Sequence, residues 1–237
     1  MRYLYSCLFL IATTPLMSQP RIKAVDFSGG IGNYEGTLSM MYSHGWRFGQ
    51  HQKFEFAIAG RFTSYLGQNQ YYITAPAELT SGSTGPFVIF KENIPENIDS
   101  VLINWPQINA LNVAIHLGYQ FNSRLSIGFN IDVIGFSFGQ QKSGSYINGA
   151  FGQQTQVTPT AFNFLLISDN DLGSLNSELC ARYYWPSQWG IKAGIQFLFT
   201  EYTTETEVQQ LPEPNDRFRD KSLLLAIGVT KSLTTKK

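Results

Sequence analysis

The sequence is short of charged residues, because only 14% of its 237 positions are Asp, Glu, Lys or Arg. A typical soluble domain has about 25%. The two signs balance at 17 basic and 17 acidic residues. A nucleic-acid-binding protein concentrates positive charge in a patch or stripe, and no long run of lysine and arginine occurs, so we expect no nucleic-acid partner. The length fits one domain, because all-β barrels of roughly 200 to 250 residues form single units.

Long apolar runs are also scarce, since no stretch after residue 18 approaches the ~18 consecutive apolar residues of a membrane helix. The N-terminus differs. Arg2 precedes an apolar run at 3–16, and the small residue Ser18 follows it, which is the layout of a secretory signal peptide. The run is shorter than the ~20 residues of a spanning helix. We predict a cleaved signal peptide over 1–18 and a mature chain over 19–237.

Cysteine is nearly absent, and the two residues are Cys7 and Cys180. Cys7 lies in the predicted signal peptide, so the mature chain has one cysteine and cannot form an internal disulfide. The histidines His44, His51 and His116 lie on separate predicted elements without the spacing of metal ligands. We expect His51 to be a solvated turn residue and His44 an interfacial one. We predict no metal and no cofactor.

Aromatic residues and glycine are abundant, at 14% and 21 residues, which favours strands and tight turns. The clearest regularity has period two. Residues 111–121 alternate apolar side chains with polar or small ones, and the pattern resumes at 125–133 after a turn. This alternation is typical of a strand with one apolar face. The phase slips at Ile134 and Gly135, which predicts a β-bulge near Gly135.

The same hairpin pattern recurs along the chain. We predict eight strands, at 23–29, 34–48, 54–66, 111–121, 125–138, 178–185, 191–202 and 222–233. The turns after the second, fourth and sixth strands are short, whereas the links at 67–110, 140–176 and 203–220 are long. Short turns on one side and long loops on the other are typical of an outer-membrane barrel. The predicted fold is an all-β, antiparallel, up-and-down transmembrane β-barrel of eight strands with long extracellular loops. Ten strands result if the segments at Tyr71 and 87–90 both cross.

Charge placement distinguishes the two faces of these strands. Between Val25 and Val229, the outward positions of the predicted strands hold no Lys, Arg, Asp or Glu except Glu201, at the end of the seventh strand. The opposite face collects the ionisable residues Asp26, Glu35, Arg47, Glu55, Arg61, His116, Asp132, Glu178, Arg182 and Lys192. Buried charges persist when they pair, and side chains can fill an eight-stranded interior. We predict a plugged polar lumen. The alternative is a soluble secreted barrel that binds a small ligand, in which the apolar side chains point inward and the charged ones outward.

Aromatic residues gather beside the three short turns. The set comprises Trp46, Phe48, Phe54, Tyr119, Phe121, Tyr183, Trp185 and Trp189. Transmembrane barrels carry such girdles where hydrocarbon meets headgroups. We predict that these side chains form an aromatic belt on the periplasmic side. The competing interpretation places them in the core of a soluble barrel.

The alternating segments LNVAIHLGYQF, LSIGFNIDVIGFSFG and GIKAGIQFLF, with the final LLLAIGVTKSL, extend over essentially the whole mature chain. In this pattern the chain resembles the small outer-membrane β-barrel family that includes the OmpX-like proteins and the transmembrane domain of OmpA. The resemblance implies a monomeric barrel in a Gram-negative outer membrane, with membrane lipid and the barrel-assembly machinery as partners. The last strand departs from the family pattern, because it continues to Lys237 and does not end on an aromatic residue.

A catalytic site is difficult to assemble from these residues. A hydrolase needs a nucleophile, a base and an orienting group within hydrogen-bond reach. His116 points inward near Asn112 and Gln120, within reach of Asp132 or Glu178. No Gly-x-Ser-x-Gly motif accompanies it. We interpret His116 as a hydrogen-bonded lumen residue and predict that the protein is not an enzyme.

The long links hold the remaining candidates. The last link is acidic, with Glu201, Glu205, Glu207, Glu213, Asp216 and Asp220 against Arg217, Arg219 and Lys221. It lacks the spacing of a calcium loop, so we expect a hydrated surface loop. The link at 67–110 is too long for a simple connector and contains Tyr71, Tyr72, the run at 87–90 and Trp105. It either extends the barrel as a hairpin or forms an aromatic binding patch.

The sequence therefore predicts a non-enzymatic outer-membrane barrel with a structural or surface-recognition role. One alternative is a surface ligand-binding or adhesion protein that acts through its long loops on an unknown extracellular ligand. Another is a lipid-modifying outer-membrane enzyme centred on His116. The soluble barrel is the third.

Overall fold

The computed structural model describes residues 21–83, 91–148, 151–166 and 170–234. The predicted signal peptide and the aromatic run at 87–90 lie outside the described residues. Strands dominate these described residues, which contain one short helix, α2 (Ala77–Ser81), and one 3₁₀ turn, η3 (Pro95–Asn97). In the part of the chain that the structure describes, no helix is both long enough and apolar enough to cross a membrane.

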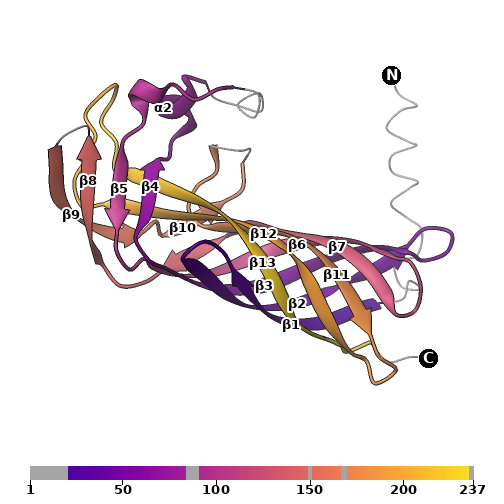
Figure 1. Ribbon diagram of the computed structural model, residues 1–237. Helices are drawn as coiled ribbons and strands as arrows, with labels where there is room; N and C mark the ends of the chain where they lie inside the picture. The colour runs from indigo at the N-terminus through magenta and orange to yellow at the C-terminus, as the bar shows by residue number, and fades with distance from the viewer. Residues whose placement is uncertain (1–20, 84–90, 149–150, 167–169, 235–237) are drawn as a thin grey trace, which may run out of the picture.

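Long strands form the body of the molecule. They are β1 (Arg21–Ile31), β2 (Glu35–Phe48), β3 (Phe54–Gly67), β6 (Gln107–Gln120), β7 (Leu125–Phe138), β11 (Leu175–Tyr184), β12 (Trp189–Thr204) and β13 (Arg217–Ser232). Each neighbour pair is antiparallel, and the run of pairs closes when β13 pairs with β1. An all-β antiparallel sheet that closes into a ring confirms the predicted fold class at this level. Figure 1 shows these strands as an elongated barrel.

The predicted irregularity in the fifth of these strands is present. Val113 pairs with Ile134, whereas the next residue, Ala114, pairs with Asp132. Val133 is therefore the extra residue, two positions before Gly135. A bulge changes the local side-chain phase, which is why Phe136 and Phe138 replace the odd-numbered set as the exposed residues beyond it.

Side chains alternate between the two faces of the ring. On β13, Leu225 and Ile227 are exposed, whereas their neighbours Leu224 and Ala226 are buried. The same alternation runs along β2 and β3. The result is an apolar outer face far larger than the few hundred Å² that a soluble monomer exposes.

Shorter strands form a second closed arrangement at one end. They are β4 (Gln70–Thr74), β5 (Ser100–Ile103), β8 (Lys142–Asn148) and β9 (Phe151–Pro159). They pair in that order, while β4 also pairs with β13 and β9 with β12. We call these four strands, together with the ends of β12 and β13 that lie farthest from the short turns, the cap. Figure 1 shows the four strands across the left end of the barrel, with α2 beyond them.

The links predicted as loops are therefore more ordered than the sequence indicates. The link at 67–110 contains β4 and β5, which form the hairpin that was one of its two interpretations. The link at 203–220 is shorter than predicted, because β12 runs to Thr204 and β13 begins at Arg217.

The link at 140–176 also contributes to the outer face of the barrel. Its last strand, β10 (Phe162–Phe164), pairs with the upper part of β7. Phe162 is 72% exposed, and it lies opposite the exposed Phe136. β10 takes the place next to β7 that β11 leaves free toward the cap, because β11 begins only at Leu175.

Candidate functional site

Arg61 lies in the middle of the barrel interior and is only 1% exposed. Its Nε donates to Oδ1 of Asp132 at 2.8 Å, and its Nη2 donates to the carbonyl oxygen of Asn176. Oδ2 of Asp132 also accepts from Nδ2 of Asn112 at 2.8 Å and from the backbone N–H of Asn176 at 3.0 Å. These residues come from β3, β6, β7 and β11, so one ion pair connects four strands across the interior.

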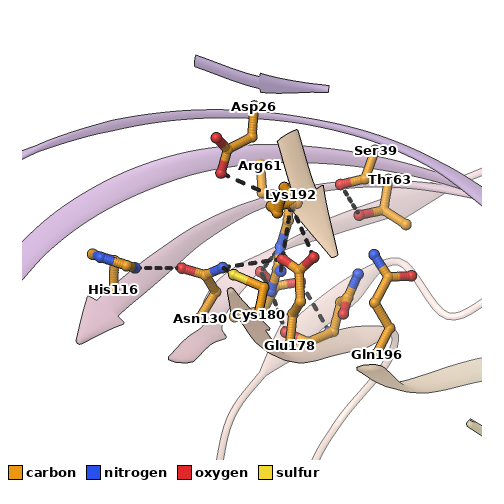
Figure 2. Close-up of polar contacts among 12 residues, drawn as sticks. Asp26, Ser39, Arg61, Thr63, His116, Asn130, Glu178, Cys180, Lys192 and Gln196 are labelled. Atoms are coloured by element: carbon orange, nitrogen blue, oxygen red, sulfur yellow. Dashed lines mark hydrogen bonds and ion pairs between the residues drawn. The ribbon is translucent and has the colours of Figure 1, made fainter. Parts of the chain in front are cut away.

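A second cluster of charges adjoins the first (Figure 2). Nη2 of Arg182 donates to Oδ2 of Asp26 at 2.7 Å. Nζ of Lys192 lies 2.8 Å from Oε1 of Glu178 and 3.8 Å from Oδ2 of Asp26. Oε2 of Glu178 lies 3.8 Å from Nη1 of Arg61. Every carboxylate in this group thus faces at least one cation, which is the condition under which buried charges persist.

The network extends toward the short turns through His116, whose link to Asn130 is visible in Figure 2. Nδ1 of His116 lies 2.7 Å from Oδ1 of Asn130, and Nδ2 of Asn130 donates to Glu178 at 3.0 Å. Nε2 of His116 lies 3.5 Å from Oε2 of Glu55, whose Oε1 accepts from Nε of Arg47 at 2.9 Å. Both ring nitrogens of His116 therefore face polar groups of the network.

The predicted lumen residues do not all lie in one cluster. Four acids and four bases are linked: Asp26, Glu55, Asp132 and Glu178 with Arg47, Arg61, Arg182 and Lys192. Arg47 is at the margin, with 31% of its side chain exposed. Glu35 lies apart near the cap, where it accepts from the hydroxyls of Tyr65 at 3.0 Å and Ser222 at 2.6 Å. The linked network has no net formal charge.

Cys180 lies inside this network and is buried. Nδ2 of Asn130 is 3.8 Å from its sulfur. A buried thiol in such a place behaves as a small apolar group. Among the residues that the structure describes, no group of three or more His, Cys, Asp and Glu side chains has the arrangement of a metal site.

A cavity of ≈520 Å³ occupies the barrel at the short-turn end. Its lining includes Glu55, His116 and Arg182. Two glycines that pair across β6 and β7, Gly118 and Gly128, make room for the side chains of His116 and Arg182. A Cβ at Gly118 would lie 2.8 Å from Nε2 of His116, and one at Gly128 would lie 2.8 Å from Nη1 of Arg182. These positions therefore have no room for side chains while His116 and Arg182 hold their places.

The opposite end is closed by apolar side chains of the cap and of the segments that adjoin it. The cluster comprises Tyr72, Val101, Ile103, Ile108, Tyr146, Val157, Tyr202, Val208 and Phe218. The rings of Tyr72 and Tyr202 meet edge to face at 5.1 Å. Burial raises the pKa of Tyr72, and burial and a hydrogen bond to Asp99 raise the pKa of Tyr146 to about 12. Both phenols stay protonated at neutral pH.

The acidic link holds a buried cluster that the sequence prediction placed in water. Glu201 and Arg219 are buried, and Nη2 of Arg219 donates to Oε2 of Glu201 at 2.7 Å. Arg217 donates to the same carboxylate, and both arginines donate to the carbonyl oxygen of Asp171. The prediction of a hydrated loop is wrong for Glu201 and Arg219. Glu201 on β12 and Arg219 on β13 lie on the outer face of the barrel sheet. The segment that contains Asp171 covers both side chains.

The predicted belt residues lie together at the short-turn end. Phe48, Phe54, Tyr119 and Phe121 form a chain of ring contacts with centroids 5.1 to 5.7 Å apart. The other members are Trp46, Tyr183, Trp185 and Trp189, and Trp46 lies 6.1 Å from the ring of His44. His51 is exposed in the first short turn.

Two rungs of the β12–β13 hairpin mark the edges of its apolar outer face. At one, Trp189 pairs with Lys231, whose Nζ is 4.9 Å from the Trp189 ring. At the other, Phe199 pairs with Lys221, whose Nζ is 5.6 Å from the Phe199 ring. Between them the outward residues are Ile191, Ala193, Ile195, Phe197, Leu223, Leu225, Ile227 and Val229. A lysine and an aromatic ring thus lie at each edge of an uncharged band.

No protein-family model matches the chain, and no curated protein matches it. Solved structures to which it is similar include Neisserial surface protein A, at 11% identity and a TM-score of 0.36, with 89% of this chain and 95% of that chain covered. The Yersinia pestis outer membrane protein Ail is 8% identical, with a TM-score of 0.36 and coverage of 91% and 100%. The Ralstonia pickettii toluene transporter TbuX is 8% identical, with a TM-score of 0.23 and coverage of 91% and 90%. Because these TM-scores are below 0.5, the fold described above rests on the strand register alone.

Proposed function

We propose that this protein is a non-enzymatic, eight-stranded transmembrane β-barrel of the outer membrane, exported through a cleaved signal peptide. Its role is structural or one of surface recognition. The observation that supports this most directly is the uncharged outer band between the Trp189–Lys231 and Phe199–Lys221 rungs. In water, such a face would leave a contiguous apolar surface exposed to solvent, which is unfavourable.

The height of the band fits a membrane. Lys221 and Lys231 are ten residues apart on one strand, which is ~34 Å along the strand at ~3.4 Å per residue. A strand tilted by ~40–45° covers ~25 Å along the barrel axis over that length, which matches the ~25 Å apolar band of outer-membrane barrels. The outer face of a soluble barrel contacts water, so nothing would exclude charged residues from a band of this height.

The interior supports a barrel that does not conduct solutes. The linked charges lie across the middle, and the apolar cluster of the cap lies over one end. A second cavity, between these two regions, has a volume of only ≈10 Å³. The open cavity at the short-turn end is therefore a closed-ended vestibule. Because His116 is engaged on both sides within this network, we assign it a structural role.

Gel mobility tests the membrane assignment. We expect the detergent-purified protein to migrate at different positions before and after boiling, because a closed barrel resists detergent until it is heated. A control sample unfolded in denaturant before loading is expected to migrate with the boiled form. A protein that dissolves without detergent and shows no shift would contradict the proposal and favour the soluble barrel.

A second function, recognition of a surface ligand, is favoured by the order of the cap. Its strands surround a buried apolar cluster, so the exposed Tyr71 on β4 and the exposed Trp105, which follows β5, project from a supported framework. A rigid framework reduces the entropy lost on binding. β12 and β13 run from the barrel into the cap, and Tyr202 of β12 adds a contact with the barrel strand β6. Its hydroxyl donates to the carbonyl of Gln107 at 3.0 Å and accepts from the Gln107 N–H at 2.9 Å.

We expect Tyr202→Phe to loosen the cap without opening the barrel. The change leaves the N–H and carbonyl of Gln107 without this partner, at a cost of ~1–2 kcal/mol. Limited proteolysis should therefore cut the 67–110 link several-fold faster, while the heat-dependent gel shift remains. Tyr71→Phe, at an exposed position, serves as the control. Equal cleavage of both variants and the native protein would show that the cap is not a preformed platform.

A further inference from the structure

Charge is polarised along the barrel axis, although the chain as a whole is neutral. We define the short-turn rim as residues 21–24, 46–55, 119–126, 183–190 and 230–234. Its cations are Arg21, Lys23, Arg47, Lys53, Arg124 and Lys231. Among these described residues the only acid is Glu55, which is buried and paired with Arg47. The rim therefore presents uncompensated positive charge.

The cap end has the opposite sign. Its described segments, 67–83, 91–107, 139–148, 151–166, 170–174 and 203–220, contain ten acidic residues against four basic ones. Three of these acids, Glu205, Glu207 and Glu213, are exposed in the link between β12 and β13. A surface of this sign does not attract anions, so anion binding is expected at the rim only.

The rim cations lie at the depth of the aromatic belt. Nζ of Lys53 is 5.9 Å from the ring of Tyr119, and Nζ of Lys231 is 4.9 Å from the ring of Trp189. Arg21 pairs in register with Trp46, and Arg124 is exposed in the second short turn. Aromatic rings of this kind occupy the headgroup level of a bilayer. Cations beside them would face lipid phosphates.

We propose that the short-turn rim binds the headgroups of anionic phospholipids in the leaflet that it faces. This inference rests on the proposed membrane function. The attraction is charge complementarity, because basic residues at an anionic membrane surface bind it with an increment for each cation. The buried cations of the vestibule do not serve this purpose, since Arg182 is paired with Asp26. Arg47 is paired with the buried Glu55, but the other five rim cations form no ion pair with a buried acid among the described residues, and Lys53 and Lys231 lie beside aromatic rings.

Lipid selectivity tests this proposal. The full chain is reconstituted in phosphatidylcholine vesicles that contain a small fraction of spin-labelled phosphatidylglycerol or spin-labelled phosphatidylcholine. Electron spin resonance measures the fraction of each lipid that is motionally restricted at the protein. We expect phosphatidylglycerol to associate about 3-fold more strongly than phosphatidylcholine at low salt. We expect this preference to fall at ~1 M salt, where the Debye length is ~3 Å.

A pair of double variants locates the effect. Lys53→Gln with Lys231→Gln removes two rim charges, and we expect the preference for phosphatidylglycerol to fall by at least half. Lys91→Gln with Lys142→Gln removes the same charge at the cap end, and we expect no change. Arg124→Gln, at an exposed turn position, should reduce the preference in the same direction as the rim pair.

The outcomes separate this inference from the membrane assignment. A protein that keeps its heat-dependent gel shift in vesicles but shows no phosphatidylglycerol preference overturns the lipid proposal alone. The same holds if the cap-end pair reduces the preference as much as the rim pair. A protein that does not enter the vesicles and shows no gel shift overturns the proposed function, and the lipid proposal with it.

Discussion

Ile227→Arg is expected to destabilise the folded barrel by ~2–4 kcal/mol, the cost of an arginine at the middle of the hydrocarbon on the lipid face of a barrel. Ile227 lies near the midpoint between Lys221 and Lys231, and it is 70% exposed. Little packing is lost at such a position, so the cost arises from moving a charge into lipid. Reversible unfolding in urea in the presence of lipid vesicles measures the change in the free energy of unfolding.

A matched control is available on the same chain. Leu233 is also an exposed aliphatic residue, but it lies beyond Lys231 at the rim. Leu233→Arg is expected to cost ~0–1 kcal/mol, as near an interface. In a soluble barrel both changes would place arginine in water and be nearly neutral. Equal, small effects at the two positions would therefore contradict the membrane assignment.

The ring strands were predictable because a chain between two different environments must alternate with period two. The outward residues Leu225 and Ile227 and the inward residue Asp132 carry that signal in the sequence itself. The bulge at Val133 was visible as a change of phase. Strand ends were less accurate, because the prediction ended strands where apolar residues stop. β13 begins at Arg217 and not at the predicted 222, since protein and not solvent covers the side chain of Arg219 there.

The cap was not predictable as a closed arrangement. β4 and β5 have five and four residues, which is too short for a clear alternation pattern. Their partners β8, β9 and the end of β13 lie far away in the chain, and single-sequence periodicity gives no information on such pairing. Tyr72 and Phe218 meet in one cluster only because β4 pairs with β13 at Phe218↔Thr74. The interior ion pairs show the same limit. The sequence indicates which charged residues point into the barrel, but not which of them pair with each other.

Arg61→Met tests whether those partners close the lumen, and we expect it to cost ~3–5 kcal/mol of unfolding free energy. The change keeps an unbranched side chain but removes the cation, so Asp132 is left buried and without its ion-pair partner, a situation that costs about this much in other buried pairs. Arg47→Met is the comparison. Its partner Glu55 is also buried, but both side chains line the open cavity at the short-turn end, where water can solvate the carboxylate, so we expect a smaller cost than for Arg61→Met.

Adding Asp132→Asn to Arg61→Met restores the charge balance of the interior, so we expect the double variant to be more stable than Arg61→Met alone. A double-mutant cycle isolates this coupling. Water would reach and solvate Asp132 if the middle of the barrel were an open channel, and Arg61→Met would then cost no more than Arg47→Met. Equal costs would contradict the plugged lumen, whereas a large cost recovered by the second substitution would place the seal at the Arg61–Asp132 pair.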